Sequence, residues 1–300
     1  MIKLEELKSG KYGEFLENEP MKNHTTFKVG GPADLLMRPT TEEQIVNIVR
    51  YCNRNEIPFM VLGNGSNLLV TDKGIRGVVI KLDKNYANIT FDGTKVTAQA
   101  GSLLSTVSKK SFKQSLTGME QVSGIPGSIG GAMVMNAGAY DKEVSSVVKK
   151  VRCLTKGGDV VEFNQAQMQF GYRSSIVSKE DLIVLEVELE LEKDDMDAIL
   201  ERFHDYDHRR TSKQPLDKNS AGSTFKRPTG YYASKLIDDS GLRGYTHKRA
   251  QVSEKHCGFV INIDDATFEE VMELIHHVQE VVKEKFGVDL EMEVKVIGEK

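Results

Sequence analysis

Two glycine-rich segments restrict what this chain can fold into more than any other feature. Residues 123–139 read SGIPGSIGGAMVMNAGA, and the segment GNGSN begins sixty residues earlier, at residue 63. Because glycine has no Cβ, its backbone can adopt positive φ and approach a ligand closely, so that successive N–H groups converge on phosphate oxygens. One such loop alone is more often a turn, but the pair predicts a wrapped diphosphate and favours a dinucleotide ligand.

The size and composition are those of an ordinary globular protein with two domains. The 300 residues are 39% hydrophobic and 28% charged, enough for a sizeable core, and include no low-complexity tract. The 40 basic and 44 acidic residues give a formal net charge of -4, with no basic tail or stripe that could follow a nucleic-acid backbone. We therefore expect no nucleic-acid partner. Any anionic ligand must be held by local cations or backbone N–H groups.

The cysteines and the N-terminal segment indicate the compartment. Cys52, Cys153 and Cys257 are widely spaced and odd in number, so they predict neither a disulfide framework nor a zinc site. Charges interrupt the apolar residues of 1–20, which argues against a signal-peptide core, and no later run reaches transmembrane length. We expect a cytoplasmic protein with no membrane partner.

Hydrophobic periodicity predicts mixed α and β structure. A capping box of Thr40 and Glu43 opens an amphipathic helix, which leads to a buried strand at 59–62 that ends at the first glycine-rich loop. Further strands are expected at 78–82, 95–100, 147–154, 182–191, 259–263 and 290–297. Further helices are expected at 102–113, 196–206, 231–240 and 267–286. The charged run at 193–195 marks a domain boundary.

The glycine-rich loops do not match the commonest nucleotide-binding motifs. No segment has the G-x-G-x-x-G of a Rossmann domain between a strand and a helix, and none has the G-x-x-x-x-G-K-[ST] of a P-loop. With NHTTFKVGGPAD before them and NAGAY behind them, the loops resemble instead the FAD-binding module of the vanillyl-alcohol-oxidase (PCMH) class.

Nearly the whole chain is similar to one family within that class, the UDP-N-acetylenolpyruvoylglucosamine reductase family. The motifs that carry the resemblance are TTF followed by GG, GNGSNLLV, SGIPGSIGGAMVMNAGAY, GYRSS, SAGSTFKRP and LEMEVKVIG. The last three are the more specific. An arginine, a serine within A-G-S-x-F-K and a near-terminal glutamate form the pattern that this family uses for catalysis.

This resemblance implies a fold and a reaction. The fold would be α+β, with an FAD-binding module of the vanillyl-alcohol-oxidase type in residues 1–192 (core about 27–192). A smaller α+β substrate-binding domain would follow in residues 193–300. The reaction would be NADPH-dependent reduction of UDP-N-acetylglucosamine enolpyruvate to UDP-N-acetylmuramate, a step of peptidoglycan precursor synthesis. FAD would be bound non-covalently, NADPH would be the electron donor, and a UDP-sugar enolpyruvyl ether would be the substrate.

The resemblance also assigns individual residues. Ser223 would donate the proton, while Arg173 and Glu293 would polarise the substrate carboxylate and stabilise the enolate-like intermediate. Arginine suits this task because its guanidinium can bind a carboxylate through two N–H bonds. The residues expected at the diphosphate of the UDP sugar are Lys213, Lys226 and Arg227. The residues expected to bind the cofactor are Gly63, Asn64, Gly65, Ser66, Asn67, Gly124, Ile125, Pro126, Gly127, Ser128, Gly130 and Gly131.

Simpler interpretations of the same residues stay open. Taken alone, Ser223 is a loop hydroxyl and Arg173 a surface cation, whereas Glu293 projects from its strand opposite the apolar residues, towards solvent or a cleft. The cations expected at the diphosphate could serve solubility alone. His204 and His208 lie four residues apart on a predicted helix but have no third ligand at a recognisable spacing, so no metal site is predicted.

The family pattern is not complete, and other functions remain possible. Only fifty positions separate Arg173 from Ser223, which indicates the shorter form of the family, without the tyrosine-bearing loop that closes over the substrate. Residues 217–219 read DKN in place of the usual Tyr-Pro, and Met292 replaces a frequent proline. The alternatives are an FAD-dependent sugar or alcohol oxidase of the same fold class and a flavin- or nucleotide-binding regulatory protein without turnover. The sequence predicts no oligomeric state.

Overall fold

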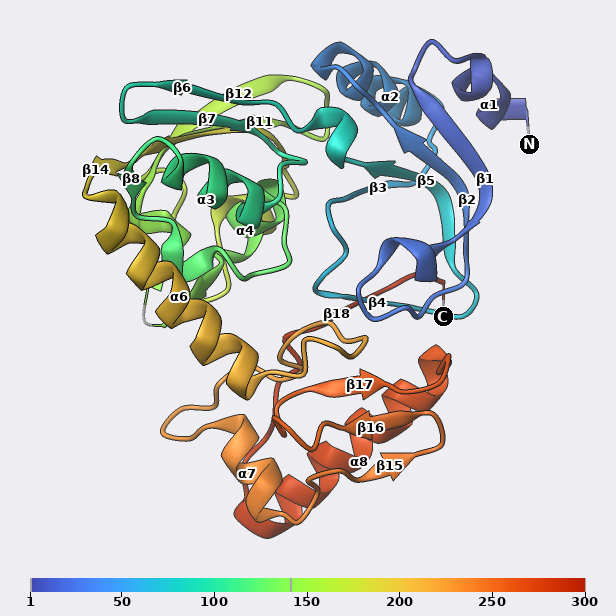
Figure 1. The fold of residues 1–300 in the computed structure, drawn as a ribbon. Helices are drawn as coiled ribbons and strands as arrows, with labels where there is room; N and C mark the ends of the chain where they lie inside the picture. Colours follow the sequence, from blue (N-terminus) through green and yellow to red (C-terminus); the bar gives the residue numbers. More distant parts are fainter. Residues whose placement is uncertain (1, 141, 300) are drawn as a thin grey trace. The chain divides into compact units, whose positions relative to one another are not determined.

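The computed structural model describes residues 2–140 and 142–299 and divides into two compact units (Figure 1). Unit 1 consists of Met1–Glu17, Leu35–Asn64 and Gly77–Arg209. Unit 2 consists of Asn18–Asp34, Gly65–Arg76 and Arg210–Lys300. The chain thus passes between the units more than once, and the first glycine-rich loop is one of the crossing points. The domain boundary predicted from the sequence, between residues 192 and 193, does not coincide with the boundaries of these units. We keep it as a proposal for the two functional domains.

The first sheet collects strands from the N-terminal part of the chain. Its order is β1-β2-β5-β3, with the bounds Glu14–Pro20, Pro32–Arg38, Ile75–Lys81 and Phe59–Leu62. The strands β3 and β5 run parallel, with Leu62 opposite Lys81. Both strands therefore end at the same edge, and the first glycine-rich loop begins there, as the sequence predicts.

The helix α2 (Glu42–Arg54) is the predicted amphipathic helix, shifted by one residue at its start. Thr41, rather than Thr40, is the N-cap, because its extended backbone lets its side chain accept a hydrogen bond from the Gln44 N–H at 3.2 Å. Thr40 instead donates its N–H to the Gln44 side chain at 2.8 Å. Ile45 and Val49 are fully buried, in one core with the apolar residues of the first sheet.

The second sheet is antiparallel and has the order β12-β11-β13-β7-β6. The bounds of these strands are Val160–Asn164, Val148–Leu154, Ile183–Glu190, Lys95–Gln99 and Ile89–Asp92. In β13, Leu185, Val187 and Leu189 are fully buried and alternate with half-buried glutamates, which confirms the predicted alternation. The helices α3 (Leu104–Phe112) and α4 (Ile129–Met135) lie against one face of this sheet (Figure 1).

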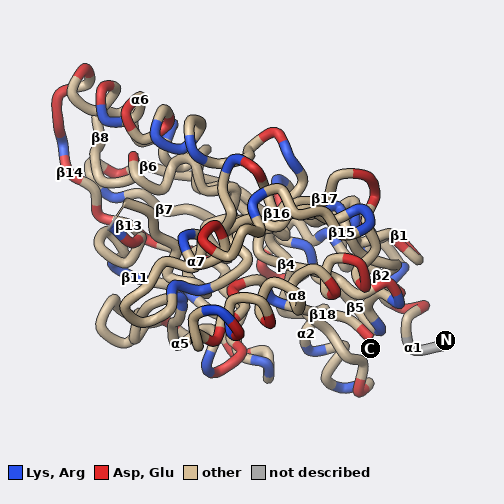
Figure 2. Tube along the Cα trace, turned by 90° about the horizontal axis from the view of Figure 1, so that it is seen from below, with Lys and Arg blue, Asp and Glu red and all other residues tan. Residues whose placement is uncertain are grey.

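The helix α6 (Met196–Lys213) is longer and more exposed than predicted. Ile199 is fully buried, but Met196 and Leu200 are 43% and 38% exposed. One stripe of the helix packs, with the Phe203 ring 5.8 Å from that of Phe112 in α3. Acidic and basic residues are interspersed along the rest (Figure 2). The apolar spacing therefore predicts the helix correctly but overstates its buried face.

The C-terminal part of unit 2 packs a small sheet on a long helix. The antiparallel sheet has the order β15-β16-β17, with the bounds Thr246–His247, Ala250–Val252 and Val260–Asn262. The helix α8 (Phe268–Phe286) begins at the predicted capping box of Thr267 and Glu270 and ends at Gly287, whose φ is 69°. The helix α7 (Ala233–Asp239) packs in one hydrophobic core with α8 and this sheet.

The end of the chain pairs with the segment that follows the first glycine-rich loop. The strand β18 (Lys295–Ile297) runs parallel to β4 (Leu68–Val70). The strand predicted at 290–297 is thus regular only over its last part. The other short elements are α1 (Ile2–Glu5), α5 (Ile176–Lys179), β8 (Leu116–Thr117), β9 (Gly138–Ala139), β10 (Lys142–Glu143) and β14 (Glu192–Lys193). Among the described helices, none combines the length and the apolar character needed to cross a membrane.

Candidate active site

Unit 1 brings the start of the first glycine-rich loop against the second. The chain leaves β3 after Leu62, and Asn64 Nδ2 donates a hydrogen bond to the Pro126 carbonyl at 2.5 Å. A Cβ on Gly63 would lie 2.3 Å from Ser128 Oγ, so any other residue at position 63 would force the Ser128 side chain to move. The structure therefore joins two motifs that are far apart in the sequence.

Some N–H groups of the second loop are used within the protein. The Gly130 N–H donates to the Ala100 carbonyl at 2.9 Å, and the Gly131 N–H donates to Ser128 Oγ, the N-cap of α4, at 3.3 Å. These hydrogen bonds satisfy the first turn of the helix. The N–H groups of Gly130 and Gly131 are therefore already paired.

Other N–H groups of the loops are available to a ligand. In the part of unit 1 that the structure describes, no acceptor is found for four backbone N–H groups, those of Asn64, Gly124, Gly127 and Ser128. The hydroxyl of Ser102, which is 1% exposed, also lacks a hydrogen-bond partner among the described residues. Unpaired N–H donors at glycine-rich turns are suited to an anionic ligand.

Alanine substitutions at adjacent glycines of α4 should differ in stability. A Cβ on Gly130 would lie 2.9 Å from the Ala100 Cβ, whereas a Cβ on Gly131 would meet only Ser128 Oγ, at 3.5 Å. Gly130→Ala should therefore lower the free energy of unfolding by about 1–3 kcal/mol through overpacking. Gly131→Ala should change it by less than about 1 kcal/mol, because alanine favours a helix. Urea unfolding of both variants tests this, and equal losses would contradict it.

A buried carboxylate anchors the segment that leads into the second loop. The Glu120 side chain is 4% exposed and accepts hydrogen bonds from Thr117 Oγ1 at 2.6 Å and the Gly118 N–H at 2.8 Å. Arg202 of α6 donates to it at 3.1 Å and pairs with Asp194 at 2.6 Å. Burial alone would raise the pKa of the Glu120 carboxyl, but these hydrogen bonds hold that pKa below its ordinary value.

The backbone of Glu120 holds the first residue of the second loop. The N–H and the hydroxyl of Ser123 both donate to the Glu120 carbonyl, at 3.2 and 2.6 Å. Arg202 thereby connects α6 to the start of the loop through Glu120. No local sequence pattern indicates this connection, because 82 positions separate the two residues.

Replacing Glu120 by glutamine should lower the free energy of unfolding by about 2 kcal/mol at pH 7, because a buried, charge-assisted bond to Arg202 is lost. The folded chain lowers the pKa of Glu120 from 4.5, so this stabilisation is complete above that pH and is lost as the pH falls through the folded value. Urea unfolding at several pH values should show the two proteins converging in acid. The exposed neighbour on α6 provides the control Glu201→Gln, and a difference that persists in acid would contradict the prediction.

Arg173 lies in a tight turn of unit 1. Gly171 and Ser174 exchange backbone hydrogen bonds of 3.0 and 3.2 Å, which leaves Tyr172 and Arg173 in the centre of the turn. Arg173 has a φ of 52°, in the left-handed region that costs energy for a residue with a Cβ. Its guanidinium lies 5.1 Å from the centroid of the Tyr172 ring. A strained backbone that presents a cation is a feature often found at functional sites.

Unit 2 brings the segments of Ser223 and Glu293 together. The Glu293 N–H donates to the Thr224 carbonyl at 2.8 Å, and Phe225 pairs with Met292 in an antiparallel bridge. Ser223 is exposed and Glu293 is half-buried. Two of the three predicted catalytic residues therefore lie on adjacent stretches of backbone, while the third, Arg173, belongs to unit 1.

The second half of the first glycine-rich loop lies on the other side of Glu293. Asn67 Nδ2 donates to the Glu293 carbonyl at 3.2 Å, and the Lys295 N–H donates to the Asn67 carbonyl at 3.0 Å. The Thr26 N–H donates to the Gly65 carbonyl at 3.2 Å. Unit 2 thus places predicted cofactor-binding and catalytic residues on neighbouring backbone segments.

The three cations predicted at the substrate diphosphate lie in unit 2 in different settings. Lys213 is the exposed last residue of α6. Lys226 forms an ion pair with Glu291, and the Arg227 guanidinium lies 4.1 Å from the centroid of the Tyr232 ring. Among the described residues, no cluster of His, Cys, Asp and Glu is large enough to hold a metal ion.

His256 also lies beside the Ser223 segment, and no sequence signal singles it out. Its Nδ1 accepts a hydrogen bond from the Gly258 N–H at 3.1 Å, and the Gly258 carbonyl accepts one from the Thr224 N–H at 2.8 Å. Burial lowers the pKa of the imidazole, and the charge of Lys213 acts in the same direction. A lone histidine has no spacing to recognise, so only the structure finds it.

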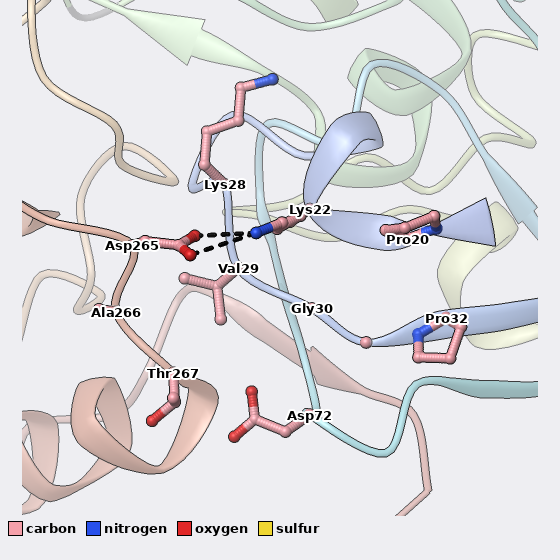
Figure 3. Close-up of a pocket in the computed structure, with 11 residues that line it drawn as sticks. Pro20, Lys22, Lys28, Val29, Gly30, Pro32, Asp72, Asp265, Ala266 and Thr267 are labelled. Carbon is pink, nitrogen blue, oxygen red and sulfur yellow. Dashed lines mark hydrogen bonds and ion pairs between the residues drawn. The ribbon is translucent and has the colours of Figure 1, made fainter. Parts of the chain in front are cut away.

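A cavity of about 300 Å³ lies next to the start of α8 in unit 2 (Figure 3). Lys22 and Asp265 form an ion pair of 3.1 Å at its wall, and Asp72 accepts a hydrogen bond of 2.9 Å from the Phe268 N–H. Asp72 thus binds the start of α8, and Lys22 and Asp265 bind each other. None of the predicted site residues lines this cavity, and we assign it no role in the reaction.

Comparison with known proteins decides the family. Residues 214–297 match the model of the UDP-N-acetylenolpyruvoylglucosamine reductase C-terminal domain, and residues 33–164 match that of an FAD binding domain. A UDP-N-acetylenolpyruvoylglucosamine reductase of Caldanaerobacter subterraneus is 50% identical over 290 residues, which cover 97% of this chain and 96% of that protein. The chain belongs to the UDP-N-acetylenolpyruvoylglucosamine reductase family.

Other members of the reductase family are similarly close. The relative from Clostridioides difficile is 52% identical over 282 residues, covering 94% of this chain and 93% of the relative. The crystal structure of UDP-N-acetylenolpyruvylglucosamine reductase from Thermus caldophilus superposes with a TM-score of 0.80 at 34% identity, covering 94% of this chain and 98% of that one. These matches confirm the predicted α+β fold, with its FAD-binding module and second domain.

Proposed function

We propose that the chain reduces UDP-N-acetylglucosamine enolpyruvate to UDP-N-acetylmuramate with electrons from NADPH, in the cytoplasmic synthesis of peptidoglycan precursors. Membership of the reductase family along nearly the whole chain is the observation that carries this proposal. The enzyme is a flavin oxidoreductase with FAD as its cofactor.

The glycine-rich loops fit the diphosphate of FAD. The contact between Asn64 and Pro126 supports this assignment, and so do the backbone N–H groups that have no acceptor in the described part of unit 1. When bound, FAD would supply the redox chemistry of the site, which is hydride transfer from NADPH to the enolpyruvyl double bond. The chain would bind and orient the cofactor through residues 63–67 of the first loop and residues 124–128, 130 and 131 of the second.

Three side chains complete the chemistry in this proposal. Hydride addition at the terminal carbon leaves negative charge on the next carbon and its carboxylate, which requires stabilisation and one proton donor. Arg173 and Glu293 polarise the carboxylate, and Ser223 Oγ donates the proton. The exposure of Ser223 and the hydrogen bond between its neighbour Thr224 and Glu293 support these roles.

The substrate diphosphate is assigned to the cations of unit 2. Lys226 and Arg227 follow Ser223 by three and four positions, and Lys213 precedes it by ten positions. An ammonium or a guanidinium stabilises phosphate oxygens through charge-assisted hydrogen bonds. For Lys226, such a contact requires exchange of its present partner, Glu291.

A visible spectrum recorded in one anaerobic cuvette tests the function. The purified protein should show a flavin spectrum, NADPH should bleach it, and the enolpyruvyl substrate should restore it while UDP-N-acetylmuramate forms. A flavin that NADPH bleaches but that only oxygen restores would contradict the proposal, as would a flavin that NADPH leaves unchanged. Reduction of the flavin by a sugar or alcohol would favour the oxidase.

A further inference from the structure

Lys81 is a buried cation at the edge where the first glycine-rich loop begins. It is the last residue of β5 and lies opposite Leu62, the last residue of the parallel strand β3. Only 8% of Lys81 is exposed, and its Nζ donates a hydrogen bond of 3.2 Å to the Gly63 carbonyl. The ammonium thus touches the loop without belonging to its motif.

Burial of this side chain requires electrostatic compensation. Lysine is among the residues least often buried, because removing an ammonium from water costs several kcal/mol unless opposite charge or dipoles replace the water. The Gly63 carbonyl is one dipole that contacts the ammonium, and a bound diphosphate would add negative charge beside it. The chain as a whole is acidic, with a net charge of -4, so an anionic ligand depends on local positive charge.

The surroundings of Lys81 favour a ligand at this edge. Parallel strands with loops at their carboxyl ends are where α/β proteins commonly bind nucleotides. The neighbouring Asn64 holds Pro126 of the second loop, and its N–H has no acceptor in the described part of unit 1. A cation and an open N–H donor therefore flank the same glycine.

We propose that Lys81 is a cofactor-binding residue whose ammonium supplies positive charge to the diphosphate of FAD and fixes the Gly63 carbonyl beside it. This inference depends on FAD being the cofactor. It adds a residue outside the glycine-rich motifs to those that hold the cofactor.

The test compares Lys81→Met with Lys84→Met. Methionine keeps an unbranched side chain, one atom shorter than that of lysine, and removes its charge, while Lys84 is an exposed lysine three positions further on. Fluorescence titration of the flavin-free full-length chain would give the dissociation constants of FAD and of riboflavin, which lacks the diphosphate. Lys81→Met should weaken FAD binding on the order of 10- to 100-fold and leave riboflavin binding within about twofold. Lys84→Met should change neither.

Two outcomes would overturn the proposal. Equal weakening of FAD and riboflavin would show that Lys81 supports only the shape of the loop, and unchanged FAD binding would show that its charge is irrelevant. Thermal unfolding of the flavin-free variant checks that the chain still folds. Because these are binding constants, they are independent of turnover. A chain that shows the expected FAD effect but does not reduce the enolpyruvyl substrate would contradict the proposed function alone.

Discussion

Ser223→Ala is expected to leave reduction of the flavin by NADPH unchanged and to slow reoxidation by the enolpyruvyl substrate about 1,000-fold. The proposed serine acts only after hydride has reached the substrate, when the adjacent carbon must take a proton. Alanine removes the hydroxyl and adds no bulk, and Ser223 is exposed, so the fold should tolerate the change. Anaerobic stopped-flow absorbance of the flavin measures the two half-reactions separately.

Ser220→Ala is the matched control for this prediction. Ser220 lies in the same segment, and its carbonyl, which the substitution retains, accepts a hydrogen bond of 2.7 Å from Thr26 Oγ1. Both half-reactions should stay within about threefold of the wild type, because a substitution away from the chemistry has a small effect. Normal reoxidation in Ser223→Ala would remove serine as the proton donor, and an equal loss in both half-reactions would indicate damage to the cofactor site.

The sequence predicts well those elements that depend on neighbouring residues. The capping box at Thr267 and the apolar stripe that follows define α8 because a helix repeats its contacts every three or four residues. The strand that ends at Gly63 is likewise a local pattern of apolar residues between turn signals. The first residue of a helix is harder to predict. Thr40 and Thr41 both suit the N-cap of α2, and the structure shows that the Thr41 hydroxyl accepts the Gln44 N–H.

Long-range contacts of the candidate site are beyond such patterns. The pairing of Glu293 with Thr224 and the contact of Glu120 with Arg202 depend on how distant segments pack. In the sequence, Lys81 is one lysine at the end of an apolar run. Its burial depends on the neighbouring loop, which a local pattern does not place beside it. Motif resemblance supplies roles for Ser223 and its partners, whereas supporting residues need the structure.

Arg173→Gly is expected to lower kcat about 100- to 1,000-fold while changing the free energy of unfolding by less than about 1 kcal/mol. The substitution removes the guanidinium proposed to stabilise negative charge on the substrate. It also relieves the backbone at a φ of 52°, which glycine adopts without steric cost. The loss of side-chain contacts and the relief of strain therefore act in opposite directions on stability, but activity should only fall.

Arg173→Lys separates these effects, because it keeps a positive charge and the strained backbone but loses the planar donor pair. Its kcat should fall about 10- to 100-fold, between the wild type and Arg173→Gly, and its free energy of unfolding should be about 1 kcal/mol lower than that of the glycine variant. Steady-state kinetics and urea unfolding on the same preparations give both values. If Arg173 were only a surface cation on a turn, glycine would raise stability and neither variant would affect kcat. That result would mean that the strained backbone at residue 173 serves the geometry of the turn between Gly171 and Ser174 and not catalysis.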